Sequence, residues 1–169
     1  MLTVSKYLDI LKPTNRIEVF QMVMINKSLI DLEASEDSQK AIFKHLAQIA
    51  FDEGRIADID GVENGLKDRE MEATTGFGKG IAIPHTKSKY VKEPTIIVLR
   101  NNQEIEWNSL DGKPVNMFIN LLVPDGKSNI HLKMLAKLSR QLMHKEFTTI
   151  LKEGSEGQIL EAIQNVLNS

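Results

Sequence analysis

Apolar residues recur at helical spacing between Ser35 and Gly54, and this pattern predicts a helix. Its inward-facing residues are Ile42, Leu46, Ile49 and Ala50. Ser35 is expected to cap the helix, with Glu36 and Asp37 in a first turn that favours negative charge. Gly54 can take the left-handed backbone conformation that ends a helix.

Two further helices are predicted from caps that precede apolar stripes. Asp60 and Glu63 have the spacing of a capping box. The stripe of this second helix is Val62, Leu66 and Arg69. Ser128 and Asn129 can cap a helix over about 130–143. Its stripe is His131, Leu135, Leu138 and Leu142.

The last helix is expected to start at Ser155, with Gln158 in the capping-box position. Its apolar face is Ile159, Ile163 and Val166. Short apolar runs predict strands at 81–83, 95–100 and 115–123. Asp111-Gly112 is a turn signal before the last of these strands.

The first 24 residues carry weaker signals. A short helix is expected over 3–11, which Lys12-Pro13-Thr14-Asn15 would end, and a strand over 17–24. Because helices and strands are intermixed along the whole chain, the predicted fold class is α/β.

Composition narrows the possible functions. The chain has 169 residues, 41% of them hydrophobic and 26% charged, which suits one globular domain. Its net charge of −2 argues against binding to nucleic acid. The chain has no membrane-length apolar run and no secretory signal, so we expect a cytoplasmic protein. Cysteine is absent, which excludes disulfides and thiolate sites.

The most informative stretch runs from Gly76 to His85 and reads GFGKGIAIPH. Three glycines form a loop, a short apolar strand follows, and Pro84 leads to one histidine. A neutral imidazole is a nucleophile near pH 7, and phosphorus is one of the electrophiles that it attacks reversibly. A single histidine after proline is more often a surface loop residue, so His85 alone does not establish a function.

Two other residues could share a site with His85. Arg69 continues the stripe of the second helix just before the glycine loop, and its planar fork of donors suits a phosphate. It could instead extend into solvent or pair with Glu70 or Glu72. His131 lies in the first turn of its helix, where an anion is favoured, but it could also cap that helix or pack in the core.

The remaining histidines and motifs point away from other chemistries. His45 lies beside an apolar stripe and is expected to be structural or half-exposed, and His144 is expected at the surface. The glycine loop is not a P-loop because Lys79 is not followed by Ser or Thr, and a strand rather than a helix follows it. The histidine spacing fits no zinc motif, and no Gly-x-Ser-x-Gly elbow is present.

The run from Arg69 to His85, which includes Thr74-Thr75-Gly76 and Ile81-Ala82-Ile83-Pro84, closely resembles a known signature. It is the phosphorylation-site signature of enzyme IIA proteins of the mannitol/fructose family in the bacterial phosphoenolpyruvate-dependent sugar phosphotransferase system (PTS). A second similarity joins Asp111-Gly112-Lys113-Pro114-Val115 to the segment around His131-Leu132. The resemblance covers about 24–167.

This resemblance implies a mixed β-sheet flanked by helices, in a single enzyme IIA domain over 24–169 with residues 1–23 as an N-terminal extension. It also implies that His85 accepts a phosphoryl group, that Arg69 binds it, and that His131 is a second active-site histidine that hydrogen-bonds it. No cofactor or metal is implied. Thr86 departs from the glycine or alanine that often follows the active histidine.

The implied partners are HPr as phosphoryl donor and an enzyme IIB as acceptor. The IIB domain would lie on a separate chain, with a membrane enzyme IIC. Phe77 and Ile130 are expected to be exposed apolar contacts for these partners. The segment from Val123 to Leu132 looks more fructose-like than mannitol-like, which favours a sugar phosphocarrier. A regulatory protein similar to the nitrogen-related enzyme IIA and a non-catalytic binding module are the alternatives.

Overall fold

The computed structural model describes residues 24–169. The helix expected over 3–11 lies outside the described residues, and so does all but the last residue of the strand expected over 17–24. No helix among residues 24–169 is both long enough and apolar enough to cross a membrane.

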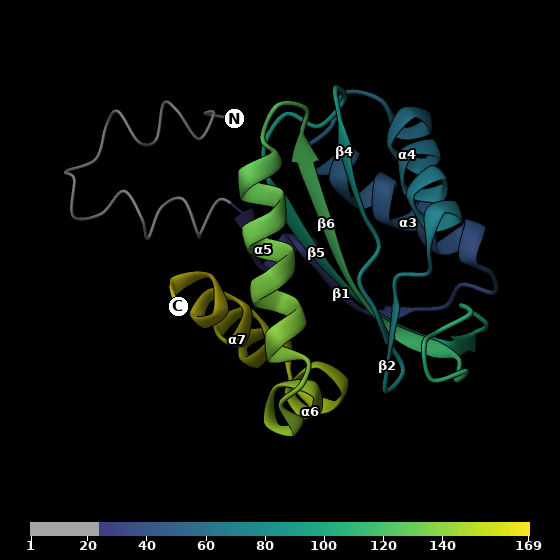
Figure 1. Ribbon diagram of the computed structural model, residues 1–169, viewed down its shortest axis with the longest axis vertical. Helices are drawn as coiled ribbons and strands as arrows, with labels where there is room; N and C mark the ends of the chain where they lie inside the picture. Colours follow the sequence, from purple (N-terminus) through teal and green to yellow (C-terminus); the bar gives the residue numbers. More distant parts are fainter. Residues whose placement is uncertain (1–23) are drawn as a thin grey trace.

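A six-stranded mixed sheet forms the centre of the molecule (Figure 1). Its strands are β1 (Ile30–Ala34), β2 (Gly76–Gly78), β3 (Ile81–Ala82), β4 (His85–Ser88), β5 (Thr95–Ile105) and β6 (Val115–Pro124). The order is β1-β5-β6-β3-β2, and β4 also pairs with β6. β5 and β2 run antiparallel to β6 and β3, whereas β1, β3 and β4 run parallel to their neighbours β5 and β6.

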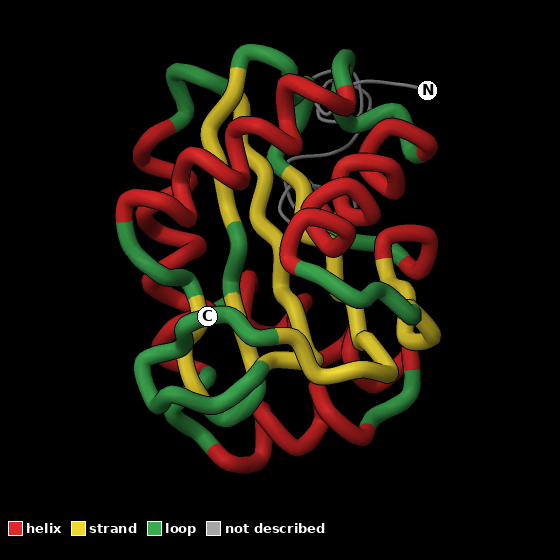
Figure 2. The backbone as a smooth tube through the Cα atoms, turned by 90° about the vertical axis from the view of Figure 1, so that its right-hand side faces the viewer, coloured by secondary structure: helices red, strands yellow, loops and turns green. Residues whose placement is uncertain are grey.

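Helices cover both faces of this sheet, as Figures 1 and 2 show. One face packs against α3 (Gln39–Asp52) and α4 (Ile59–Glu72). The other packs against α5 (Ser128–Gln141), α6 (Lys145–Glu153) and α7 (Glu156–Asn168). A short 3₁₀ helix, η2 (Lys27–Leu29), precedes β1. The predicted α/β class and the implied mixed sheet are confirmed.

Strand β6 organises the two cores because its side chains alternate between the faces. Phe118 and Leu122 belong to the core under α3 and α4, whereas Met117, Ile119 and Leu121 belong to the core under α5–α7. All five are fully buried. A strand buried on both faces appears in sequence as a continuous apolar run, which is why it was predictable.

The predicted N-caps of three helices, α3, α4 and α5, are wrong. The α3 cap is Ser38, whose Oγ accepts from the Ala41 N–H at 3.1 Å, and not Ser35. The backbone of Glu36 is held out of the helix by Asn101 on β5, which accepts from its N–H at 2.7 Å and donates to its carbonyl at 2.9 Å. A tertiary contact of this kind has no local sequence signal.

Helix α4 is capped by Asp58, whose carboxylate accepts from the Gly61 N–H at 2.9 Å, so Asp60 lies inside the first turn. Helix α5 begins at Ser128, and Lys127 precedes it without a side-chain capping bond. Ser128 and Asn129 therefore lie within the helix and do not cap it. The capping box of Ser155 and Gln158 on α7 is confirmed.

Several elements were not predicted. β2 and β4 are short and lack an alternating apolar pattern, so their pairing partners decide their conformation. β1 reads IDLEA, an alternation of apolar and polar residues that was readable but covers only five positions. Helix α6 carries a readable stripe of Phe147, Ile150 and Leu151 that the sequence analysis did not use. β5 extends beyond its predicted end at residue 100 to Ile105 through an irregular pairing.

Gly65 of α4 offers a test of how closely α4 packs on β4. A Cβ at Gly65 would lie 2.8 Å from Thr86 Oγ1 but 3.5 Å from Thr86 Cβ. We expect Gly65→Ala to destabilise the protein, because overpacking costs roughly 1–3 kcal/mol and exceeds the gain in helix propensity of about 1 kcal/mol. In a Thr86→Ala background the same change should instead stabilise, by up to about 1 kcal/mol, because only the ordinary Cβ contact remains. Denaturant unfolding measures both effects.

Gly157→Ala in α7 is the matched control, because a Cβ there meets nothing within 4 Å. An identical effect of Gly65→Ala in both backgrounds would show that this contact does not limit the packing of the two elements.

Candidate functional site

The three residues singled out in the sequence lie together in the structure. Arg69 is in the last turn of α4, His85 begins β4, and His131 is the fourth residue of α5. The Nε of Arg69 lies 3.1 Å from the Nε2 of His85, and the ring centroids of the two histidines are 5.1 Å apart. Elements from both faces of the sheet therefore meet at the start of β4.

The sheet explains why they meet. His85 pairs with Leu121 on β6, and its side chain lies on the face covered by α5, where His131 points inward. Helix α4 packs beside β4 from the opposite face, and its C-terminal turn brings Arg69 round the strand end. Both histidines are buried, with 5% of His85 and 9% of His131 exposed.

Hydrogen bonds determine which nitrogen of His85 is reactive. Nδ1 lies 2.7 Å from the carbonyl oxygen of Ile83, which can only accept, so Nδ1 carries the hydrogen and donates it. Nε2 therefore holds the lone pair and accepts the hydrogen bond from Arg69 Nε. The nucleophilic atom of this imidazole is Nε2.

Burial keeps His85 neutral. Desolvation lowers the pKa of His85 below its ordinary value, the hydrogen bond to Ile83 opposes this, and the positive charge of Arg69 lowers the pKa further. A neutral imidazole near pH 7 has the free lone pair that nucleophilic attack requires.

His131 is also neutral. Burial, together with electrostatic interactions with His85, Lys87 and Arg69, lowers its pKa from 6.5 to about 4. Its Nε2 atom is buried and has no hydrogen-bond partner among residues 24–169. An unpaired buried polar atom is costly, so this nitrogen is available to a group that enters the site.

Lys87 is a functional candidate that the sequence analysis missed. It lies two residues after His85 on β4, and side chains two apart in a strand point to the same face. Its Nζ donates to Ser128 Oγ at the start of α5, at 3.2 Å. Strand periodicity was the signal that could have identified it. Lys87 adds a second positive charge beside the two histidines.

Glu70 is a second missed residue, and it holds the loop that leads to the glycines. Its carboxylate accepts from the Thr75 N–H at 2.7 Å and from the Thr75 hydroxyl at 2.6 Å. The carbonyl of Thr75 in turn accepts from the Ile83 N–H at 3.0 Å. Arg69 Nη1 donates to the Ala73 carbonyl in the same loop at 2.9 Å. Glu70 thus supports the two residues that contact the His85 ring, Ile83 and Arg69.

The structure decides between the alternatives for Arg69. No ion pair joins it to Glu70 or Glu72, and it is directed to His85.

The hydroxyl of Thr86 lies against Gly65 of α4 and donates to the Lys87 carbonyl at 3.3 Å. His45 is half-buried between the carboxylates of Asp31 and Glu36, and His144 is exposed, so both predictions are confirmed.

The prediction that Phe77 and Ile130 are exposed contacts is wrong. Both are half-buried and pack against the core under α5–α7. The exposed apolar side chain beside the site is Leu132, which is 64% exposed and follows His131.

No group of three potential metal-ligating His, Cys, Asp or Glu side chains occurs within residues 24–169.

Comparisons with known proteins identify the family of the chain. The family model described as "Phosphoenolpyruvate-dependent sugar phosphotransferase system, EIIA 2" matches residues 23–166. A protein of Escherichia coli K12 named "PTS system fructose-like EIIA component" is 36% identical over 148 residues, which are 88% of this chain and 100% of that protein.

Two solved structures share the fold. The nitrogen regulatory protein IIA-Ntr of Neisseria meningitidis has a TM-score of 0.77 and 27% identity, and covers 83% of this chain and 97% of that one. The second match comes from a complex of enzyme IIAMtl with phosphorylated enzyme IIBMtl from Escherichia coli. It has a TM-score of 0.69 over 83% of this chain and 97% of that one, and at 14% identity the similarity concerns the fold alone.

The lowered pKa of His131 predicts a dependence of stability on pH. The folded state favours the neutral ring, so its contribution is complete above pH 6.5 and is lost as pH falls from 6.5 to about 4. Over this interval His131 should contribute a slope of up to about 1.4 kcal/mol per pH unit to the free energy of unfolding. His131→Asn should flatten the profile measured by denaturant unfolding. Parallel profiles for the two proteins would contradict the lowered pKa.

Glu70→Gln tests the support of the site. Glutamine cannot accept from both Thr75 donors, and the loss should cost about 1–3 kcal/mol of stability. We also expect the ¹⁵N resonance of His85 Nε2 to shift, because the loop that positions Arg69 is displaced. Glu72→Gln is the matched control, since Glu72 is exposed and its side chain makes no hydrogen bond to residues 24–169. An unchanged Nε2 resonance in Glu70→Gln would remove Glu70 from this role.

Proposed function

Because the chain belongs to the EIIA 2 family of the phosphoenolpyruvate-dependent sugar phosphotransferase system, whose members are phosphotransferases that carry a phosphoryl group on histidine, we propose that His85 is the carrier and Nε2 the phosphorylated atom. The observation that carries this proposal is the pair of hydrogen bonds on its ring. Nδ1–H is engaged by Ile83, and the Nε2 lone pair faces Arg69 and His131.

The transfer balances without a proton leaving His85. The Nε2 lone pair forms a new N–P bond while the N–P bond of the donor phosphohistidine breaks and returns its electron pair to the donor ring. The phosphorylated ring of His85 keeps its hydrogen on Nδ1 and carries a positive charge, which the Ile83 carbonyl stabilises. A protonated ring is also the better leaving group for the second transfer.

The negative charge of the phosphoryl group is stabilised by Arg69, His131 and Lys87. Once the Nε2 lone pair is used, the Nε–H of Arg69 no longer has that acceptor and can donate to a phosphoryl oxygen. His131 donates from Nε2 in the tautomer that carries hydrogen there. The transition state of phosphoryl transfer is loose, so donors positioned around the equatorial oxygens supply most of the catalysis.

The proposed donor is the phosphohistidine of HPr, and the proposed acceptor is an enzyme IIB that operates with a membrane enzyme IIC on the cytoplasmic side. The enzyme IIAMtl of the solved complex binds phosphorylated enzyme IIBMtl, which supports an acceptor of this kind. An acceptor cysteine is not present in these 169 residues, so it belongs to the partner. Leu132 beside His131 is the apolar side chain that both partners would contact in turn.

The favoured pathway is uptake of fructose or a related sugar, which the similarity to a fructose-like EIIA component supports. A regulatory role is the second candidate, because the nitrogen regulatory protein IIA-Ntr matches in fold at 27% identity. The two roles share the same chemistry at His85. They differ in whether the phosphoryl group is passed to an enzyme IIB, so an assay of that step separates them.

The decisive experiment is labelling from phosphoenolpyruvate with enzyme I and HPr. We expect one acid-labile, base-stable phosphoryl group per chain, absent from His85→Ala and retained in His144→Ala, which removes an exposed histidine as a control. His131→Ala should accept the group but pass it to an enzyme IIB roughly 10²-fold more slowly, the size of effect seen when one oxyanion donor is removed. Labelling that survives His85→Ala would refute the assignment.

A further inference from the structure

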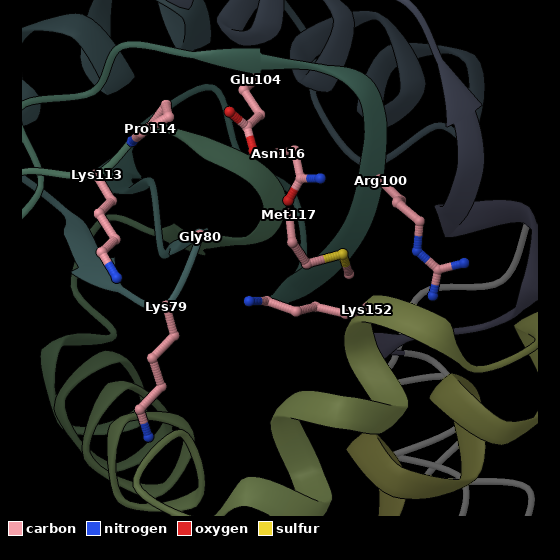
Figure 3. Close-up of a pocket in the computed structure, with 9 residues that line it drawn as sticks. All are labelled: Lys79, Gly80, Arg100, Glu104, Lys113, Pro114, Asn116, Met117 and Lys152. Carbon is pink, nitrogen blue, oxygen red and sulfur yellow. The ribbon is translucent and has the colours of Figure 1, made fainter.

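A basic pocket of about 340 Å³ lies at the far end of β6 from His85 (Figure 3). It is lined by Lys79, Arg100, Glu104, Lys113, Asn116 and Lys152, among others. β6 pairs with β3 at Met117 and with His85 at Leu121, four residues further along. At about 3.3 Å per residue, the pocket is therefore some 13 Å from the phosphoryl-transfer site along the strand.

The lining is strongly positive. Four cationic residues line the pocket with one carboxylate, that of Glu104, in a chain whose net charge is −2. Asp111 adds a second negative charge at the edge, next to Lys113, where hydrogen bonds from the N–H groups of Lys79 and Lys113 lower its pKa. The concentration of positive charge is thus local to the pocket.

Two of the four cations are held by the backbone. Lys79 Nζ donates to the Leu142 carbonyl after α5 at 3.2 Å, and Arg100 donates to the carbonyls of Leu151 and Gly154 at the end of α6. Arg100 Nε is buried and finds no hydrogen-bond partner in the part of the chain that the structure describes. These contacts hold two positively charged groups at the sides of the pocket. Neither group forms an ion pair with a carboxylate of the described residues.

The other two cations have no hydrogen-bonded partner among the described residues, although Lys113 interacts electrostatically with Asp111. The ammonium groups of Lys113 and Lys152 make no hydrogen bond or ion pair with any described residue. In Figure 3 Lys152 extends from α6 across the pocket towards Met117 and Gly80. Such a pair of free ammonium groups, on opposite sides of a concavity, is suited to a dianion.

The backbone under Lys152 is the two-residue turn between β2 and β3. Both of its residues, Lys79 and Gly80, have the positive φ that such a hairpin turn requires, and the N–H of Lys79 is held by Asp111 at 3.0 Å. A Cβ at Gly80 would lie 3.4 Å from Lys152 Nζ and 3.5 Å from Asn116 Oδ1, so the turn, Lys152 and Asn116 lie close together at the pocket.

We propose that this pocket binds a small organic phosphate ester, with the phosphate between Lys113 and Lys152. The rest of the ester carries hydroxyl groups. These groups donate hydrogen bonds to the carboxylate of Glu104 and accept hydrogen bonds from the amide of Asn116. The volume lies at the lower end of the range for small-molecule sites, about 300–1,000 Å³, which suits a phosphorylated sugar or polyol. An anion without such a remainder would leave Glu104 and Asn116 unused. This site is independent of His85.

The test is a ¹⁵N-NMR titration of the His85→Ala protein with glucose 6-phosphate, with inorganic phosphate and glucose as companion probes. We expect shifts of the backbone amides of Gly80, Asn116 and Met117, with a Kd of about 1 mM or tighter for the ester. Inorganic phosphate should bind more weakly, and glucose should cause no shift.

Lys113→Met and Lys152→Met should each weaken binding at least tenfold, since each removes a charge but keeps the aliphatic stem. Both lysines are exposed, so the variants are expected to fold, and the spectra report this directly. Lys133→Met, at an exposed position on α5, is the matched control and should leave the Kd unchanged.

Four results would overturn the proposal: no shift at Gly80 and Asn116, shifts confined to the surroundings of Arg69 and His131, equal binding of the ester and glucose, or an unchanged Kd in both lysine variants. Binding of inorganic phosphate as tight as that of the ester would overturn the role of Glu104 and Asn116. Because the titration uses His85→Ala and no phosphoryl donor, these outcomes leave the carrier role of His85 untouched.

Discussion

The hydrogen bond from His85 Nδ1 to the Ile83 carbonyl is the interaction on which the site depends. It places the lone pair on Nε2, and without it the ring could turn or change tautomer. The carbonyl can do this because its peptide is held on both sides. The Ile83 N–H donates to Thr75, and the Pro84 carbonyl accepts from the buried amide of Asn120 at 3.0 Å and from the Leu121 N–H at 3.1 Å. Backbone and side-chain hydrogen bonds therefore hold the two residues between β3 and β4 in place.

Sequence reasoning found the centre of the site but not its support. Arg69, His85 and His131 were identified because a motif and a helical stripe carried them, and α7 because a capping box is local. The role of Glu70 could not be read in the same way, since its partner Thr75 lies in a loop whose conformation depends on tertiary contacts such as the bond from Trp107 to the Thr75 hydroxyl. The shift of the α3 cap to Ser38 has the same origin, a contact with β5.

Burial and charge act on the site in the same direction. Desolvation alone would lower the pKa of both histidines, and the nearby cations lower the pKa of each further. The positive potential that discourages protonation of the imidazoles also attracts a phosphoryl group, because both effects come from cations in a poorly solvated pocket. In the proposed mechanism, one arrangement thus keeps the Nε2 lone pair of His85 free and prepares the site for the negative charge of a phosphoryl group.

The positive electrostatic potential at the site requires that nearby carboxylates do not neutralise its cations. Glu70 follows Arg69 directly, but consecutive residues on a helix point in different directions, and the carboxylate is engaged by the N–H and hydroxyl of Thr75. The Glu70 carboxylate is therefore hydrogen-bonded to the loop and not paired with Arg69. The Arg69 side chain donates to His85 and to the Ala73 carbonyl. The adjacent acid and base of the motif therefore do separate work. A carboxylate that paired with Arg69 would give a more ordinary ion pair and a weaker phosphoryl site.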